Sequence, residues 1–360
     1  MMMNDSCPYH VVRTLTTPAP ISALQFGHAG HVYAGSGDGT LRVYDLSSYK
    51  VLKAVRGLKN EVSSIACLKR PGSETRDAWV ACGHQIFLFK MDMISMIATV
   101  EDAITTVQVT ETDDELNEIT LDPSKKHLAF STDLGVVGVV DLTVAIPTVM
   151  KMKEKHTSIC ACVKFVPDRP REIVSTGYDE TFLHFDFVEG DPLTQHKLDF
   201  TSNTEGVSLS PPFIMSTAFS TTGILAAGIA DGSLWVGFGG QKGSSKMKTK
   251  KSRKWNGLSP EGKQVCDKVA EGPIVAMTFL SPDTLVASTL LGLVIQWKIK
   301  IDSVNQEDIV KEIWRKQAVA LDKVNALVAI DTKIAIGGLS KDGKGVFEVW
   351  DRRGTPEVST

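Results

Sequence analysis

The sequence lacks a long run of apolar residues and a recognisable targeting segment. None of its apolar stretches approaches the roughly 20 residues that a membrane-spanning helix requires. The first residues, MMMNDSCPYH, contain neither the basic region nor the apolar core of a secretory signal. We therefore expect a soluble intracellular protein, cytoplasmic, nuclear or both, with no membrane partner.

The sequence also lacks the short motifs that carry most catalytic and cofactor chemistry. It contains no GxxxxGK[ST] phosphate loop, no HExxH zinc helix and no GxSxG nucleophile turn. Cys160 and Cys162 are not matched by a second Cys or His pair at ligand spacing, and zinc needs about four ligands, so we expect buried thiols. These absences predict no catalytic residue, no metal, no cofactor and no small-molecule substrate.

The sequence has little excess of either positive or negative charge. The 39 Lys and Arg residues are balanced by 42 Asp and Glu residues, which gives a net charge of −3. Without a global basic field, nucleic acid is an unlikely partner. A chain of 360 residues is long enough to bury a large core, so the fold class has to come from the residue pattern.

The clearest pattern is the stretch Val32–Asp45, VYAGSGDGTLRVYD, which reads as two short strands joined by a tight turn. Asp38 and Gly39 suit a two-residue hairpin turn, because both tolerate positive φ better than most residues do. The unit recurs six times, at Trp79–Phe89, His127–Asp141, Ile173–Asp186, Ile224–Phe238, Leu285–Lys298 and Ile334–Asp351.

Each copy is preceded by an alternating apolar strand and followed by a weaker one. Four strands repeated every 45 to 60 residues or so are typical of a propeller blade. We predict an all-β, seven-bladed propeller that forms a single domain over residues 8–353. The blades are expected at 17–57, 58–109, 110–153, 154–201, 213–271, 272–317 and 318–353 plus 8–16.

Two segments have no obvious place among the repeats and are assigned to outer strands. The strand Val11–Leu15 has no blade of its own, and we expect it to close the ring as the outer strand of blade seven, which removes an open edge. Asn305–Arg315 has a spacing that also permits a helix, but an outer strand for blade six fits the repeat better.

Two charged segments interrupt the blades. Glu111–Glu118 holds five acidic residues in eight, among them Asp113, Asp114 and Glu115, and should lead into blade three. Residues 239–262 read as a disordered, lysine-rich loop within blade five. Its basic residues include Lys246, Lys248, Lys250, Lys251, Arg253 and Lys254. The two segments belong to loop classes that lie on opposite faces of a propeller.

His156, Ser175 and Asp179 have the residue types of a catalytic triad. In a propeller they also have a structural interpretation, in which His156 and Ser175 hold the turn residue Asp179, with Phe185 in the place of a tryptophan. We favour the structural role.

The third strands of three copies end in an aromatic residue followed by Asp, at Tyr44-Asp45, Phe185-Asp186 and Trp350-Asp351. Together with the four-strand repeat, these pairs resemble the WD-repeat family, which implies a scaffold that binds other proteins. A narrower likeness, over residues 113–121 and 155–187, is to family members grouped among candidate substrate receptors of cullin-RING ubiquitin ligases.

The resemblance implies a docking motif. Such receptors bind the ligase adaptor through W-D-x-R at the end of a third strand, and Trp350, Asp351 and Arg353 fit this pattern. Arg353 offers five N–H donors to a partner. The same residues are also ordinary in a WD repeat without an adaptor.

Two other functions stay open. Asp113, Asp114 and Glu115 would suit a chaperone or assembly factor for a basic client, such as a ribosomal protein or histone, and the basic loop would suit nuclear import or contact with RNA. Both segments also read as plain solvated loops. An enzyme is disfavoured, because inner strands such as Ile21–Phe26 and Ile274–Phe279 are mostly apolar.

Overall fold

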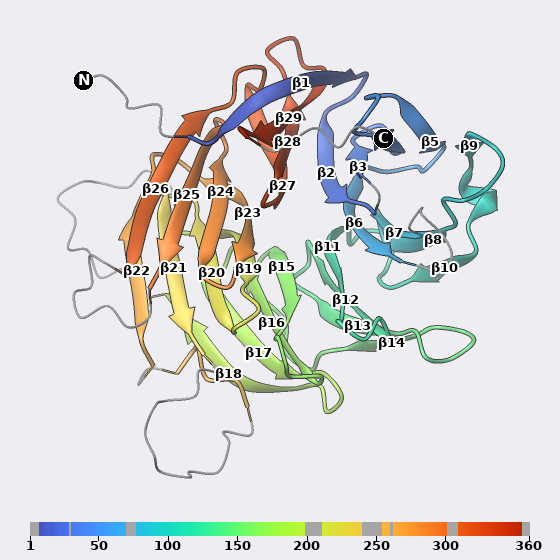
Figure 1. Cartoon of the computed structure of the whole chain (residues 1–360). Coiled ribbons are helices and arrows are strands. Elements are labelled where there is room, and N and C mark those ends of the chain that lie inside the picture. The colour runs from blue at the N-terminus through green and yellow to red at the C-terminus, as the bar shows by residue number, and fades with distance from the viewer. Residues whose placement is uncertain are drawn as a thin grey trace.

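Seven small antiparallel sheets stand around a central axis in the computed structural model (Figure 1). The structure describes residues 7–28, 30–69, 77–198, 211–239, 254–259, 262–300 and 309–354. In this part of the chain one short 3₁₀ turn, Val100–Asp102, is the sole helical element, and no helix has the length and apolarity to cross a bilayer. The predicted all-β, seven-bladed propeller is confirmed.

In every blade four strands follow one another from the axis outward, here called the inner, second, third and outer strands. The inner strands are β2 (Ile21–Phe26), β6 (Val62–Leu68), β11 (Leu116–Leu121), β15 (Cys160–Phe165), β19 (Ile214–Phe219), β23 (Ile274–Ser281) and β27 (Lys323–Ile330). The second strands are β3 (His31–Ser36), β7 (Asp77–Cys82), β12 (His127–Thr132), β16 (Glu172–Gly177), β20 (Ile224–Ile229), β24 (Thr284–Thr289) and β28 (Lys333–Leu339).

The third strands are β4 (Thr40–Asp45), β8 (Gln85–Phe89), β13 (Val137–Asp141), β17 (Thr181–Asp186), β21 (Ser233–Phe238), β25 (Leu293–Ile299) and β29 (Gly345–Arg352). The outer strands are β5 (Val51–Val55), β10 (Thr105–Gln108), β14 (Thr148–Lys151), β18 (Asp191–Lys197), β22 (Gln264–Lys268), β26 (Val310–Gln317) and β1 (Tyr9–Thr17).

The ring is closed by β1, which pairs antiparallel with β29 from Tyr9 opposite Arg352 to Thr17 opposite Gly345. Figure 1 shows this N-terminal strand lying along the outside of blade seven. The predicted closure is confirmed. Because the first and last strands of the ring share a sheet, neither leaves an open seam between blades one and seven.

Two local features differ from the sequence expectations. Ser36 pairs with Thr40, so the first hairpin turn holds three residues and not two, and only Gly39 in it has a positive φ, of 68°. The two-residue strand β9 (Ile97–Ala98) lies within the range predicted for blade two, but it pairs in parallel with β5 as a fifth strand of blade one. Within the segment whose spacing also permitted a helix, residues 310–315 belong to β26, the outer strand favoured for blade six.

Each inner strand carries a β-bulge near its start, at Ser22, Ser63, Asn117, Ala161, Met215, Val275 and Asn325. A bulge re-aims the side chain of its extra residue. Ser22 Oγ donates to the carbonyl of Val62 at 2.8 Å, and Asn325 Nδ2 donates to the carbonyl of Ile21 at 2.8 Å. These side chains therefore join neighbouring inner strands around the axis.

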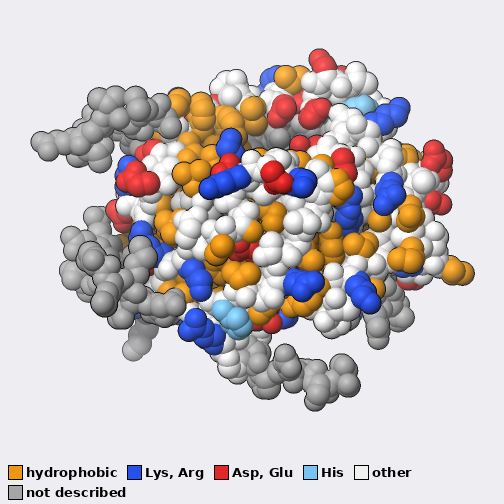
Figure 2. Space-filling view, turned by 90° about the horizontal axis from the view of Figure 1, so that it is seen from above, with side chains coloured by type: hydrophobic (Ala, Val, Ile, Leu, Met, Phe, Trp, Pro, Cys, Tyr) orange, Lys and Arg blue, Asp and Glu red, His pale blue; other side chains and the backbone are white. Residues whose placement is uncertain are grey.

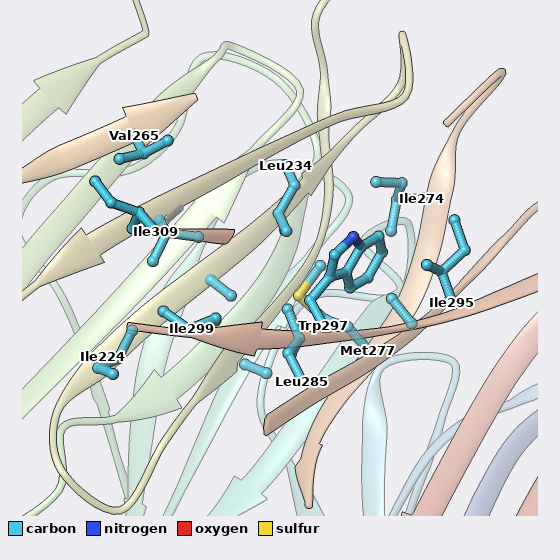
Figure 3. Close-up of a cluster of buried hydrophobic side chains, with 14 of the residues drawn as sticks. Ile224, Leu234, Val265, Ile274, Met277, Leu285, Ile295, Trp297, Ile299 and Ile309 are labelled. Atoms are coloured by element: carbon cyan, nitrogen blue, oxygen red, sulfur yellow. The ribbon is translucent and has the colours of Figure 1, made fainter. Parts of the chain in front are cut away.

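The hydrophobic core is divided among seven clusters, each of which joins two neighbouring blades. Figure 3 shows the cluster of blades five and six, where Trp297, Met277 and Ile274 pack against Leu234. Close approach depends on small residues in the second strands. A Cβ atom on Gly228 would lie 2.6 Å from Cγ2 of Ile274, so a larger residue there would push blade six away.

Candidate interaction sites

The motif in blade seven combines a buried anchor with an exposed end. Trp350 is fully buried, and its indole N–H donates to Oε2 of Glu348 at 2.7 Å. Lys333 Nζ donates to Asp351 Oδ1 at 2.6 Å. The backbone N–H of Arg353 donates to the carbonyl of Pro8 at 2.7 Å, while the residue itself is exposed. The strand end is thus fixed from three sides, and Arg353 is at the surface.

Glu348 contacts the motif through Trp350, and the sequence analysis did not single it out. Its side chain is completely buried, and its Oε1 accepts the backbone N–H groups of Val319, at 2.8 Å, and Ala320, in the loop that leads into blade seven. One carboxylate therefore holds both this loop and Trp350. The signal in the sequence is a Glu inside an apolar strand, two residues before a Trp, which places both side chains on one face.

The three triad-like residues meet in blade four. His156 Nδ1 lies 2.8 Å from Asp179 Oδ1, and His156 Nε2 lies 2.9 Å from Ser175 Oγ. The backbone N–H of Thr157 donates to Asp179 Oδ2 at 2.9 Å. Ser175 has no exposed surface, so a substrate has no access to its hydroxyl. The geometry fits the structural role.

The electrostatics of Asp179 agree with that role. Burial raises the pKa of its carboxyl, but the hydrogen bond and charge of His156, with the N–H groups of Thr157 and Thr181, outweigh burial and hold the pKa below its usual value. Asp179 is therefore a charged acceptor that fastens the loop leading into blade four. Phe185, at the position predicted for it, is fully buried.

The acidic segment is only partly exposed. Asp114 is buried, with its Oδ1 accepting the N–H of Leu134 at 2.9 Å, so this carboxylate caps a turn and does not face solvent. Asp113 and Glu115 are exposed. The expectation that all three carboxylates meet a client is wrong for Asp114, because its hydrogen bond holds it inside the blade.

Most of the predicted basic loop, including Lys246, Lys248, Lys250, Lys251 and Arg253, lies outside the described residues. The end of the loop, residues 254–259, is packed against the blades and differs from the disorder predicted there. Lys254 is exposed, and its Nζ donates to the carbonyl of Leu193 at 3.2 Å. Trp255 is buried, with its backbone N–H donating to Glu172 at 2.8 Å and its indole N–H to Gly223 at 2.9 Å.

The contacts of the two charged segments place them at opposite ends of the blades. The indole N–H of Trp255 donates to the carbonyl of Gly223, in the turn between a first and a second strand. By contrast, the N–H of Leu116, within the acidic segment, donates to the carbonyl of Gly83, in a turn between a second and a third strand. Elsewhere, acidic and basic side chains are interspersed over the face seen in Figure 2.

Comparison with known proteins gives one fold and one sequence likeness. No family model matches the chain. It is similar to the crystal structure of the Cps50 (Swd1) β-propeller domain of Myceliophteria thermophila, with a TM-score of 0.66 and 12% identity over 96% of this chain and 99% of that one. It is also 22% identical over 222 residues to a WD repeat-containing protein 53 homolog of Dictyostelium discoideum. That alignment covers 57% of this chain and 58% of the relative, less than two thirds of its length.

The chain is a seven-bladed β-propeller in fold, and part of its sequence is similar to a WD-repeat protein. The sequence likeness is to the same subgroup that residues 113–121 and 155–187 resemble.

Polar side chains line the central channel of the propeller beside apolar ones, although the inner strands are mostly apolar in sequence. The channel encloses about 490 Å³. Its polar lining residues are Ser22, Gln25, Ser63, Ser64, Asn117, Glu118, Thr120, Lys164, Ser216, Thr217, Thr278 and Asn325. Many apolar residues of the inner strands pack between blades, while bulges and alternation turn polar residues to the axis.

An ion pair joins the inner strands of blades three and four at the channel wall. Lys164 Nζ pairs with Glu118 Oε1, and Glu118 Oε2 accepts the N–H of Val163 at 2.8 Å. A Lys within the apolar strand CACVKF is the sequence signal for it. Because both charges have partners, this pair joins two blades.

Proposed function

We propose that this propeller is a substrate receptor of a cullin-RING ubiquitin ligase and docks on the ligase adaptor through Trp350, Asp351 and Arg353. The observation that supports it most is the rigid, exposed end of β29. Trp350 is buried against Glu348, and Asp351 is held by Lys333, so Arg353 is presented from a fixed strand end.

The chemistry of Arg353 suits this role. A guanidinium donates several N–H groups in a fixed plane, which fits carboxylates and carbonyls on a partner. A fixed backbone reduces the conformational entropy that docking would otherwise lose. The likeness to WD repeat-containing protein 53 adds support, because that subgroup includes candidate receptors of this kind.

Co-purification with the purified adaptor tests the proposal. Arg353→Ala is expected to weaken binding by about tenfold or more, as loss of an interface arginine commonly does. Arg352→Ala is the matched control, since Arg352 is the adjacent exposed arginine and occupies the variable position of W-D-x-R. The control is expected to bind like the unaltered chain. Equal binding by both variants would contradict the proposal.

A further inference from the structure

Three aromatic side chains gather at one mouth of the central channel. Phe165, Phe219 and Phe279 occupy equivalent positions near the ends of β15, β19 and β23, opposite Ile173, Leu225 and Leu285 of the second strands. These three inner strands follow one another around the axis (Figure 1).

The three rings line a cavity of about 470 Å³. We call it the aromatic cup and define it by Phe165, Phe219, Phe279, Met277 and Asp168. Its volume falls in the range of ligand sites, and its combination of apolar walls with a few polar groups is typical of them.

The charges around the cup leave one carboxylate without a counter-ion. The charged residues of its lining are Lys164 and Asp168. Lys164 is already paired with Glu118. Asp168 is exposed in the turn between β15 and β16, and among the described residues it has no ion pair. The cup therefore offers aromatic side chains and a rim with a negative charge.

We infer that the aromatic cup binds a lysine side chain of a protein partner, flanked in that partner by apolar residues. The faces of aromatic rings attract an ammonium group, and the long aliphatic stem of lysine covers apolar surface while its charge stays near the rim. Asp168 supplies a charge-assisted hydrogen bond. A purely apolar side chain would leave Asp168 unused, and an anionic one would be repelled by it.

This site is separate from the adaptor motif. First and third strands of a blade run in the same direction, so the cup and the end of β29 lie at the same end of the molecule. The cup is formed by blades three to six, however, and the motif belongs to blade seven. The inference goes beyond the proposed function and does not depend on it.

The test uses the full chain with isotope-labelled methionine methyl groups, because Met277 lines the cup. Three capped peptides are titrated: acetyl-Leu-Lys-Leu-amide, its norleucine analogue and its glutamate analogue. Norleucine keeps the aliphatic stem of lysine and lacks the ammonium group. The lysine peptide is expected to shift the Met277 signal and to bind about tenfold tighter than the norleucine peptide. The glutamate peptide is expected not to bind.

Variants separate charge from shape. Asp168→Asn, an exposed and nearly isosteric change, is expected to remove most of the preference for lysine over norleucine. Phe279→Leu keeps an apolar wall and is expected to weaken the lysine peptide more than the norleucine peptide, since it removes an aromatic face. Arg353→Ala is expected to change neither affinity, even if it abolishes adaptor binding.

Three results would overturn the inference. One is equal affinity for the lysine and norleucine peptides in the unaltered chain. Another is tighter binding of the glutamate peptide, which would make Lys164 the dominant charge. The third is a shift of buried Met91, in the cluster of blades one and two, without a shift of Met277.

Discussion

Blades four and seven fasten the loops that lead into them with one carboxylate each, but they take that carboxylate from different places. In blade four it is Asp179, in the turn after β16, assisted by His156 and Ser175. In blade seven it is Glu348, inside β29, assisted by Trp350. The shared requirement is an acceptor for the loop's backbone N–H groups, and the identity of the residue that supplies it is free to vary.

The difference has a consequence for function. Asp179 lies in a turn and has 11% of its side chain exposed, whereas Glu348 is completely buried in a strand. Glu348 also shares that strand with the adaptor motif proposed above. In blade seven the hydrogen bonds of Glu348 therefore fix both a loop and the strand that carries the adaptor motif. In blade four the hydrogen bonds of Asp179 fix only a loop.

Removing the carboxylate of blade seven is expected to have the largest effect. Glu348→Ala leaves the buried indole N–H of Trp350 without its acceptor and also removes the acceptor of the backbone N–H groups of Val319 and Ala320. An unsatisfied buried donor is expected to lower the free energy of unfolding by about 1–3 kcal/mol. Urea denaturation measures it.

Glu271→Ala is the control for that change, because the Glu271 side chain is 92% exposed. It is expected to leave the unfolding free energy unaltered. A loss of less than about 1 kcal/mol in Glu348→Ala would show that the carboxylate of blade seven is dispensable.

In blade four, the contribution of the Asp179 carboxylate to stability is expected to depend on pH. Since the pKa of Asp179 is lowered by folding, the unfolded chain binds a proton more readily. The stabilisation from Asp179 is therefore complete above the unfolded pKa of about 3.9 and is lost as the pH falls below it toward the folded pKa. Asp179→Asn cannot titrate and lacks this contribution.

Urea denaturation of both proteins at several pH values between about 7 and 3 measures the difference. The unaltered chain is expected to be more stable at neutral pH, and its advantage over Asp179→Asn is expected to shrink in acid. An advantage that is constant across the series would mean that Asp179 is held by shape alone and not by its charge.

The sequence predicts the features that repeat, and it misses those that a single residue decides. Seven alternating units and a spare N-terminal strand define the ring, because the period of two and the turn residues recur in every blade. Glu348 and Asp114 escape that reading, because a carboxylate within a strand or loop looks the same whether it caps N–H groups or faces water. The polar side chains that line the channel were missed because the bulges at Ser22 and Asn325 change which residues face the axis.

The pairing of strand β9 with blade one was not predicted, for a different reason. Its residues belong to the chain segment after the third strand of blade two, yet Ala54 and Arg56 of blade one donate to Met96 and Ala98. Pairing between blades depends on where a long connection travels in space, and no local pattern of two residues encodes that path.

The smallest predicted effect on stability concerns a position that the two blades share. Asp351 ends the third strand of blade seven and pairs with Lys333 at 2.6 Å; Asp186 ends that of blade four and pairs with Arg171 at 2.8 Å. All four side chains are partly exposed, so Lys333→Ala and Arg171→Ala are each expected to lower the free energy of unfolding only slightly, and less in high salt. If the proposed adaptor role is right, only Lys333→Ala should also weaken adaptor binding, because only Asp351 belongs to the motif. Equal effects of both variants on binding would mean that the end of β29 acts through its net charge and not through the geometry that distinguishes blade seven from blade four.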